Sequence, residues 1–309
     1  MQTKISGRSV LIIGGGPAGI SAAQWCCELG LEATLIESAD EFGGQLLRIY
    51  NPINNYLGLE TANGLELRER FLAAVEPRPF VRRTSSPVTQ LNTGDLVATL
   101  ASGEVIKASA IILATGVRRR KLRVAGEEMF RGKGILESGS REKEQVAGKR
   151  VLIAGGGDAA IENALILAER ASRVMVVHRR SEFSARKEFL DAARRHPRIE
   201  FITGDTIAEI GGIDHVEFVG LQNSYTGKSY KILVDYVLTR IGVEPNSDLV
   251  LGKVDMDNRE YVLVDSHCRT SVPGVFAAGD VASPVSPTIS SAVGQGSAAA
   301  KSVFDLVMR

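Results

Sequence analysis

The strongest constraint on the fold of this chain is an internal duplication. Residues 9–19 read SVLIIGGGPAG and residues 150–160 read RVLIAGGGDAA, so the same apolar run and glycine loop occur twice, 141 residues apart. A buried strand followed by a glycine-rich turn and a helix is the opening of a dinucleotide-binding βαβ unit. Two such openings in 309 residues predict two domains of this kind in one chain.

The first glycine loop has the surroundings that a phosphate-binding turn needs. A strand is expected at 9–13, a helix from about 17 to 29, and a second strand at 33–36 that ends at Glu37. In this setting the helix N-terminus presents backbone N–H groups to a phosphate. A glycine turn required only by packing is the alternative interpretation.

Each glycine of this first loop has a separate expected role. Gly14 makes the tight turn, Gly16 lets a pyrophosphate approach the backbone, and Gly19 lets the helix pack closely on the strand. Glu37 follows Gly14 by 23 residues, and its carboxylate can accept hydrogen bonds from a ribose diol. The pattern predicts an unphosphorylated dinucleotide at this site.

The second glycine loop carries a different charge at the equivalent strand end. This loop has the form in which alanine replaces the last glycine: Gly155, Gly157 and Ala160. The residue 23 positions after Gly155 is His178, and Arg179 and Arg180 follow it. Arginines bind a 2′-phosphate through charge-assisted hydrogen bonds, so this site is predicted to prefer NADPH over NADH. A solvated basic turn is the alternative.

The remaining pattern places short strands and one helix around these units. A helix is expected at 63–76, short strands at 79–108 and 199–240, and a buried strand at 111–116. Further strands are expected at 261–264 and within GVFAAGD at 274–280, followed by a C-terminal helix. For that helix Ser286 reads as the N-cap and Pro287 as the first helical residue.

Composition excludes several classes of protein. The 37 basic and 36 acidic residues give a net charge of +1, which argues against a dedicated nucleic-acid binder. Three cysteines without a CxxC pair argue against a disulfide framework and indicate a reducing cytoplasm. No apolar run is long enough for a membrane span, no metal-ligand spacing occurs, and the N-terminus reads as a strand rather than a signal peptide.

Two unlike dinucleotide sites in one chain indicate a flavoprotein in which FAD stays bound and NADPH visits. The C-terminal strand ends at Gly279 and Asp280, and an aspartate there can bond a ribityl hydroxyl. A helix N-terminus close to the flavin would stabilise negative charge on the reduced ring.

The chain resembles the low-molecular-weight thioredoxin reductases and their relatives among the two-dinucleotide flavoproteins. The resemblance runs over essentially the whole length, in these motifs: GGGPAG at 14–19, GGQL at 43–46, NYLG at 55–58, ATG at 114–116, GGGDAA at 155–160, HRR at 178–180 and TSVPGVFAAGDV at 270–281. It implies an α/β fold with two Rossmann-like domains of three layers (ββα). It also implies an FAD domain made of 1–117 and 246–309, an inserted NAD(P)H domain at 118–245, and a homodimer.

The resemblance also implies which residues contact the cofactors. Gly43, Gly44, Gln45 and Asn55 would lie along the FAD, and the backbone of Thr288 and Ile289 would face the flavin pyrimidine edge. With these, the expected FAD residues are Gly14, Gly16, Pro17, Ala18, Gly19, Glu37, Val88, Ala114, Thr115, Gly116, Gly279 and Asp280. The expected NADPH residues are Gly155, Gly157, Asp158, Ala159, His178, Arg179 and Arg180.

The chain departs from the family pattern at the redox disulfide. Counting four residues forward from Gly134 and fourteen back from Gly155 places Ser138 and Arg141 where the family has the cysteines of its CxxC. Neither side chain can relay electrons as a thiol. A second departure is Ser184, which stands where the NADPH signature has another arginine, while Arg186 lies two residues further on. The preference for NADPH is therefore expected to be weaker.

These observations predict an FAD-dependent NAD(P)H oxidoreductase that passes electrons from NADPH through FAD to an external acceptor. The acceptor is a small protein, a quinone or another small molecule, and no side chain is assigned a catalytic role because the cofactors carry the chemistry. One alternative is a ferredoxin/flavodoxin–NADP reductase of the thioredoxin reductase-like type, although such proteins usually extend beyond the last helix and this chain stops at Arg309. The other is a non-catalytic flavin or NADPH sensor.

Overall fold

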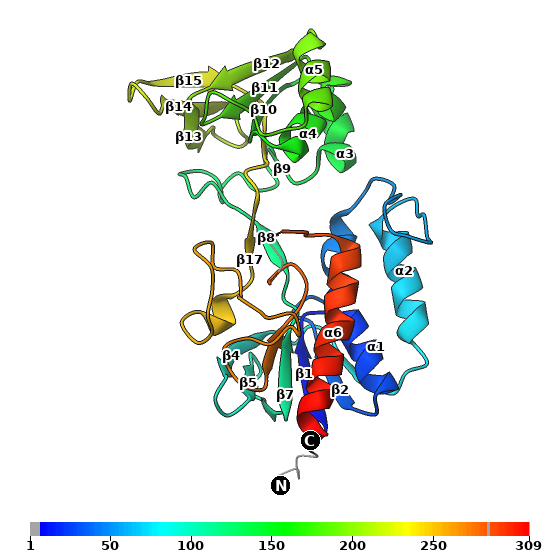
Figure 1. Cartoon of the computed structure of the whole chain (residues 1–309). Coiled ribbons are helices and arrows are strands. Elements are labelled where there is room, and N and C mark those ends of the chain that lie inside the picture. The colour runs from blue at the N-terminus through cyan, green and yellow to red at the C-terminus, as the bar shows by residue number, and fades with distance from the viewer. Residues whose placement is uncertain (1–6, 283–284, 309) are drawn as a thin grey trace. The chain divides into compact units, whose positions relative to one another are not determined.

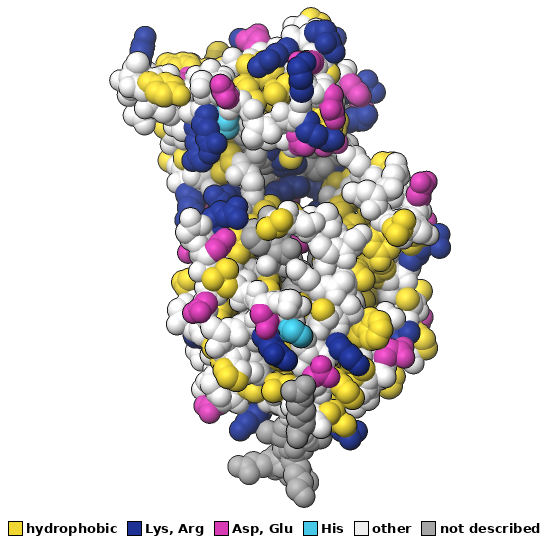
Figure 2. Space-filling view, in the orientation of Figure 1, with side chains coloured by type: hydrophobic (Ala, Val, Ile, Leu, Met, Phe, Trp, Pro, Cys, Tyr) yellow, Lys and Arg dark blue, Asp and Glu magenta, His cyan; other side chains and the backbone are white. Residues whose placement is uncertain are grey.

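The structure is a computed structural model that describes residues 7–282 and 285–308. The chain divides into two compact units, one formed by Met1–Arg118 with Glu244–Arg309 and the other by Arg119–Val243. We call them unit 1 and unit 2. On the face shown in Figure 2, both units carry basic and acidic side chains on their surfaces.

Unit 1 is built on a five-stranded parallel sheet. Its strands, in spatial order, are β18 (Val275–Ala277), β7 (Ala110–Leu113), β1 (Ser9–Ile13), β2 (Glu32–Ile36) and β3 (Val81–Arg83). One side carries the helices α1 (Pro17–Glu28), α2 (Gly64–Val75) and α6 (Ile289–Val307) (Figure 1). The other side carries an antiparallel sheet of β4 (Val88–Asn92), β5 (Val97–Leu100) and β6 (Val105–Lys107). These are the three layers that the sequence predicts.

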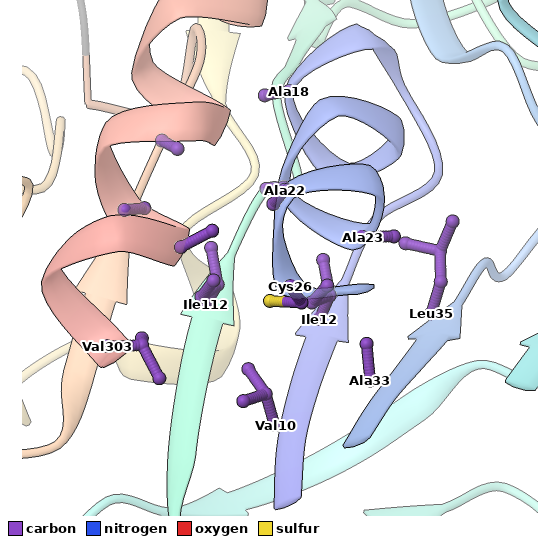
Figure 3. Packing of buried hydrophobic residues seen from close by; sticks show 14 of the residues in the cluster. Val10, Ile12, Ala18, Ala22, Ala23, Cys26, Ala33, Leu35, Ile112 and Val303 are labelled. Carbon is purple, nitrogen blue, oxygen red and sulfur yellow. The ribbon is translucent and has the colours of Figure 1, made fainter. Parts of the chain in front are cut away.

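The side chains of the central strand alternate between two cores. Val10 and Ile12 pack with residues of α1 and α6, as Figure 3 shows, whereas Leu11 and Ile13 pack against the antiparallel sheet. Successive side chains of a strand point to opposite faces, so a continuously apolar strand is buried on both. The run SVLII therefore specifies the middle strand of three layers.

Small residues bring the helices α1 and α6 close together. Gly296 lies so near α1 that an added Cβ would be 2.2 Å from the carbonyl oxygen of Ala18. Ala22 and Ala299 are fully buried in the same core, and the Ser21 hydroxyl donates to the Val293 carbonyl at 2.7 Å. This packing holds the N-terminus of α6 beside the first glycine loop.

Unit 2 repeats the same layers. Its parallel sheet contains β12 (Ile199–Thr203), β11 (Arg173–His178), β10 (Arg150–Ala154), β16 (Tyr236–Thr239) and β9 (Ile135–Leu136). An antiparallel sheet of β13 (Asp205–Gly211), β14 (Phe218–Asn223) and β15 (Ser229–Leu233) covers one face. The helices are α3 (Gly139–Glu142), α4 (Asp158–Ala168) and α5 (Lys187–Arg195), with the short η2 (Lys143–Val146) after α3.

The central strand of unit 2 alternates as its counterpart does. Val151 and Ile153 pack with the residues of α4, whereas Leu152 and Ala154 belong to the core shared with β13 and β14. The duplicated sequence thus produces the same two-sided burial twice. The chain crosses between units next to β8 (Val117–Arg119) and β17 (Val243–Pro245), which form a two-stranded sheet, and η3 (Asp248–Val250) follows.

The structure differs from the expectations at the start of the last helix and at residues 261–264. The last helix begins at Ile289 and its N-cap is Thr288, not Ser286, because the Thr288 side chain accepts from the Ser291 backbone N–H at 3.1 Å and completes a capping box. Residues 261–264 form no strand and contribute only an isolated bridge between Met256 and Val262. Among the described helices, none combines the length and apolarity that crossing a bilayer requires.

Candidate functional site

A continuous hollow runs along the carboxyl edge of the parallel sheet in unit 1. It consists of a cavity of about 380 Å³ and an adjoining one of about 330 Å³, which share Gly14, Glu37, Ser38, Thr115 and Asn246. Its walls are the segments that follow strands β1, β2, β7 and β18. Ligands of open α/β sheets bind in the crevice outside the carboxyl ends of the strands.

The first glycine loop lines this hollow, and its glycines lie very close to neighbouring backbone atoms. Gly14 has φ +111°, and an added Cβ there would lie 2.2 Å from the Ala114 carbonyl oxygen. An added Cβ on Gly19 would lie 1.9 Å from the Gly14 carbonyl oxygen. Gly16 is open toward the hollow, since the nearest atom to an added Cβ is the Gly44 Cα at 3.9 Å. The loop therefore leaves a bare backbone at the N-terminus of α1.

A second glycine turn lies against the first one. Gly43 and Gly44 have φ +135° and +54°, and the Gly43 N–H donates to the Gly15 carbonyl at 2.8 Å. They lead into the short helix η1 (Gly44–Arg48), which lines the larger cavity. The Gln45 side-chain amide donates to the Val117 carbonyl at 2.8 Å, and both residues line the larger cavity.

The Glu37 carboxylate is held by the backbone at the end of β2. One oxygen accepts from the Gly15 N–H at 2.7 Å, and the other accepts from the Ala39 N–H and the Ser38 hydroxyl, both at 2.9 Å. Glu37 lines both cavities. These bonds fix the orientation of the Glu37 carboxylate next to the glycine loop.

The opposite wall comes from the C-terminal part of the chain. Gly279 has φ +78°, and its N–H donates to the Gln295 side chain at 2.7 Å. Asp280 lines the cavity, has no protein hydrogen-bond or ion-pair partner among the described residues, and has a pKa raised by partial burial. Thr288 and Ile289 bring the N-terminus of α6 to the same cavity. An unpartnered carboxylate and a helix N-terminus are both groups that a polar ligand can bind.

Most of the expected FAD residues gather at this hollow. Those lining one of the two cavities are Gly14, Gly16, Pro17, Ala18, Glu37, Gly44, Gln45, Val88, Ala114, Thr115, Gly116, Gly279, Asp280, Thr288 and Ile289. Gly19 and Gly43 do not line it but shape its glycine turns. Asn55 is exposed and is not among the lining residues.

Other lining residues carry no signal in the sequence. Asn246 exchanges hydrogen bonds with Thr115, donating from its side chain at 2.8 Å and accepting at its carbonyl at 2.7 Å. Arg48 and Arg118 also line the larger cavity. Only the three-dimensional structure brings these residues to the glycine loops, because their positions belong to none of the glycine motifs.

The second glycine loop has the same backbone geometry in unit 2. Gly155 has φ +147°, and an added Cβ would lie 2.2 Å from the Arg240 carbonyl oxygen. Gly157 is open, with the Ser184 hydroxyl 3.8 Å from an added Cβ, and Asp158 and the exposed Ala159 begin α4. This loop also presents bare backbone at a helix N-terminus.

The basic residues at the end of β11 differ in their environments. The His178 ring packs beside Gly156 and Phe183, and its pKa is lowered by burial and by the neighbouring Arg180 charge. Arg179 and Arg180 are exposed, and neither has an ion-pair or hydrogen-bond partner among the residues that the structure describes. Two unpaired guanidinium groups follow the strand whose counterpart in unit 1 ends in a carboxylate.

Arg186 does not take the place of the missing arginine at Ser184. It donates to Asp158 through its backbone N–H at 2.7 Å and its side chain at 2.8 Å, and it also pairs with Glu188 at 3.2 Å. The hydrogen bond from the Arg186 backbone is the main reason that the Asp158 pKa is lowered. Arg186 is thus held at the start of α4.

Ser138 and Arg141 lie together at the start of α3. The Ser138 side chain accepts from the Arg141 backbone N–H at 3.3 Å, and the Ser138 N–H donates to the Glu142 carboxylate at 2.6 Å. Ser138 is buried, whereas the Arg141 side chain is half exposed and lies 3.8 Å from Glu142. The pair caps a helix, and neither residue has redox chemistry.

The three thiols are neither paired nor activated. Cys26 and Cys268 are buried, and burial raises their pKa values to about 12 and about 11. Cys27 is partly buried, and its pKa is also raised by burial. Cys268 belongs to the helix-side core of unit 1. A neutral buried thiol is a poor nucleophile.

This chain is similar to known proteins over most of its length. The profile of the pyridine nucleotide-disulphide oxidoreductase family matches residues 8–296. The chain belongs to this family. Within it, the thioredoxin reductase of Mycolicibacterium smegmatis is 35% identical over 302 residues, which cover 97% of this chain and 96% of that protein. The family resemblance seen in the sequence is confirmed.

Other members of the pyridine nucleotide-disulphide oxidoreductase family extend the comparison. The crystal structure of Lactococcus lactis thioredoxin reductase (FR conformation) superposes with a TM-score of 0.86 at 30% identity, covering 97% of this chain and 99% of that one. The bifunctional thioredoxin reductase/thioredoxin of Mycobacterium leprae (strain TN) is 35% identical, and the match covers 94% of this chain but 64% of that protein. The protein is therefore an FAD-dependent NAD(P)H oxidoreductase with two dinucleotide-binding domains, and its cofactors are FAD and NADPH.

Proposed function

We propose that this protein passes electrons from NADPH, through FAD, directly to an external acceptor and without an internal dithiol. In this proposal the hollow of unit 1 holds FAD and the second glycine loop holds NADPH. Residues 1–117 and 246–309 then form the FAD-binding domain, and residues 118–245 form the NAD(P)H-binding domain.

The fit of the hollow to FAD rests on three of its features. The first feature is the bare backbone at Gly14–Gly16 with the N-terminus of α1, which suits a pyrophosphate. A side chain at Gly14 would displace this loop and so disturb the pyrophosphate site. The oriented Glu37 carboxylate suits a ribose diol. The unpartnered Asp280 carboxylate suits a further hydroxyl group at the other end.

The assignment of NADPH to unit 2 rests on charge. Arg179 and Arg180 are exposed cations without protein partners among the described residues, next to the glycine loop of Gly155 and Gly157. A 2′-phosphate would satisfy both guanidinium groups, whereas NADH would leave them solvated. The absence of an arginine at position 184 supports a moderate rather than a strong preference.

The main observation that supports direct electron transfer from FAD to an external acceptor is the helix cap at Ser138. A CxxC relay needs two thiols within bonding distance, and the two residues at those positions are a capping serine and an arginine. The cysteines that exist are buried in unit 1 or lie on α1, with pKa values above the usual thiol range. No thiol of the chain is suited to replace the relay.

The side chains of this protein bind and orient rather than react. The glycine loops position two dinucleotides, the carboxylates orient hydroxyl groups, and the N-terminus of α6 supplies a partial positive charge to the larger cavity. When bound, FAD supplies the chemistry that accepts a hydride from NADPH and returns electrons one or two at a time.

The test is anaerobic reduction by NADPH followed by reoxidation with several acceptors in parallel. Thioredoxin, ferredoxin, flavodoxin, a quinone, ferricyanide and oxygen are compared by stopped-flow absorbance of the flavin. Reoxidation by the quinone or by ferricyanide, without thioredoxin turnover, is expected. Thioredoxin reduction would overturn the proposal, fast reaction with ferredoxin or flavodoxin would favour the corresponding NADP reductase, and failure of every acceptor would favour a sensor.

The expected homodimer and the cytoplasmic location stay predictions. Analytical ultracentrifugation of the purified protein measures the first directly. A single species with the mass of one chain across a hundredfold range of concentration would contradict it.

A further inference from the structure

We propose that Arg48 selects an electron acceptor that is a small molecule with an anionic group such as a carboxylate, phosphate or sulfonate. This inference rests on the proposed function, because an acceptor meets the cavity of unit 1 only if no dithiol intervenes. Arg48 is an exposed residue at the end of η1, and it lines the larger cavity.

Arg48 differs in its pairing from Arg118, which lines the same cavity. Arg118 is neutralised by Glu244 at 2.8 Å and by Asp248, and the Glu41 carboxylate pairs with Arg68 at 2.7 Å. Arg48 has no ion-pair or hydrogen-bond partner among the residues that the structure describes. It is therefore a cation of the cavity wall whose charge is available to a ligand.

Arg48 lies away from the first glycine loop, where the pyrophosphate of FAD is proposed to bind. Gly44 opens η1 against Gly16, with an added Cβ 2.9 Å from the Gly16 Cα. Arg48 lies four residues further along this 3₁₀ helix, at about 2 Å per residue. The next residue, Ile49, packs in the same apolar cluster as Ile289 at the N-terminus of α6. Arg48 is thus displaced by roughly 8 Å toward the α6 end of the cavity.

A guanidinium group at this place would attract and orient an anion. It offers a fork of N–H donors that matches a carboxylate, phosphate or sulfonate in two parallel hydrogen bonds. With ferricyanide as the probe, NADPH and two ferricyanide ions yield NADP⁺, one proton and two ferrocyanide ions. With a neutral quinone, NADPH, one proton and the quinone yield NADP⁺ and the hydroquinone. Arg48 is expected to accelerate the first reaction but not the second.

The experiment compares R48Q and R48K with the unmodified protein and with R259Q. Arg259 is an exposed arginine of unit 1 that pairs with Asp257 at 3.6 Å and lines neither cavity, so its variant controls for the loss of one positive charge. The kcat/KM for ferricyanide should fall about tenfold in R48Q, recover partly in R48K, and stay within twofold in R259Q. Rates with menadione and the rate of flavin reduction by NADPH should stay within twofold in R259Q, and in R48Q the ratio of kcat/KM for ferricyanide to that for menadione should fall about tenfold.

A second measurement does not depend on turnover. Hexacyanocobaltate(III) has the charge and shape of ferricyanide but is not reduced, and its binding to the FAD-loaded protein is followed by calorimetry. R48Q should weaken this binding about tenfold, and added salt should remove the difference. Unchanged binding and unchanged ferricyanide kinetics would overturn the proposal.

Two further outcomes have distinct meanings. Loss of FAD from R48Q, with equal losses for ferricyanide and menadione, would show that Arg48 holds the flavin cofactor instead and would overturn the proposal. If the unmodified protein is reduced by NADPH but reacts with no acceptor, the proposed function fails. The calorimetric comparison of hexacyanocobaltate binding then still decides whether Arg48 is an anion site.

Discussion

Ser138 accepts a hydrogen bond from the backbone N–H of Arg141 at 3.3 Å, and this contact closes the N-terminus of α3. The two residues contribute a helix cap, and neither carries a thiol. Glu142 strengthens the cap by accepting from the N–H groups of Glu137 and Ser138 at 2.8 and 2.6 Å.

Thioredoxin should not be a substrate, with or without Cys268. NADPH oxidation with thioredoxin should stay at the rate without acceptor in the unmodified protein and in C268S, because the Cys268 thiol is buried and donates weakly to the Gln295 carbonyl at 3.6 Å. The measurement is NADPH oxidation coupled to the reduction of the thioredoxin disulfide. Thioredoxin turnover that survives C268S would show that the redox centre lies elsewhere.

Preference for NADPH over NADH should depend on Arg179 and Arg180. Replacing both with alanine should lower kcat/KM for NADPH about tenfold and leave NADH nearly unchanged, since hydrogen bonds to a charged phosphate are lost. R173A is the matched control, because Arg173 begins the same strand β11 and pairs with Glu200 at 2.6 Å. Equal kcat/KM for both nucleotides in the unmodified protein would rule out 2′-phosphate recognition.

The first glycine loop should not tolerate a side chain at Gly14. G14A should lower the melting temperature by several degrees and release FAD, because the added Cβ would be 2.2 Å from the Ala114 carbonyl oxygen. G30A is the control, since Gly30 also has positive φ (+70°) but no atom within 4 Å of an added Cβ, and it should cost only about 1–2 kcal/mol. Thermal unfolding with flavin fluorescence measures both, and an equal effect of the two substitutions would exclude the steric argument.

The capping box of α6 should contribute measurably to stability. T288A should lower the free energy of unfolding of the flavin-free protein by about 1 kcal/mol, because the Ser291 N–H loses its acceptor. S286A should change it by less than about 0.5 kcal/mol, since only the Ser286 carbonyl takes part in the cap. Urea unfolding distinguishes them, and a larger effect of S286A would restore Ser286 as the N-cap.

Stability should fall at alkaline pH because of the buried thiols. The pKa of Cys268 is raised from 9.0 to about 11 in the folded protein, so the folded state keeps a proton that the unfolded chain releases above pH 9.0. The stability that the protonated Cys268 thiol contributes is complete below the pKa of the unfolded chain. It falls by about 2 kcal/mol as the pH rises from 9.0 to about 11. C268A should therefore lose less stability between pH 9 and 11 than the unmodified protein, whereas parallel slopes would contradict the assignment.

The sequence alone determined the elements whose cause is local. The run SVLII and its counterpart RVLIA predict buried strands, and the glycine loops predict turns after them. The structure has both strands, and Gly14 and Gly155 take φ values of +111° and +147° in the turns. The carboxylate after one strand and the arginines after the other are also visible in the sequence, because the βαβ pattern sets their spacing from the glycine loop.

Only the tertiary structure decided which distant segments meet. Arg48, Asn246 and the N-terminus of α6 line one cavity, although no periodicity connects residues 44–48, 246 and 287–292. Packing also paired Arg186 with Asp158, moved the helix cap from Ser286 to Thr288, and buried Cys268. Local patterns report backbone conformation and which faces of an element are buried, whereas the partner of a side chain depends on contacts between segments far apart in the chain.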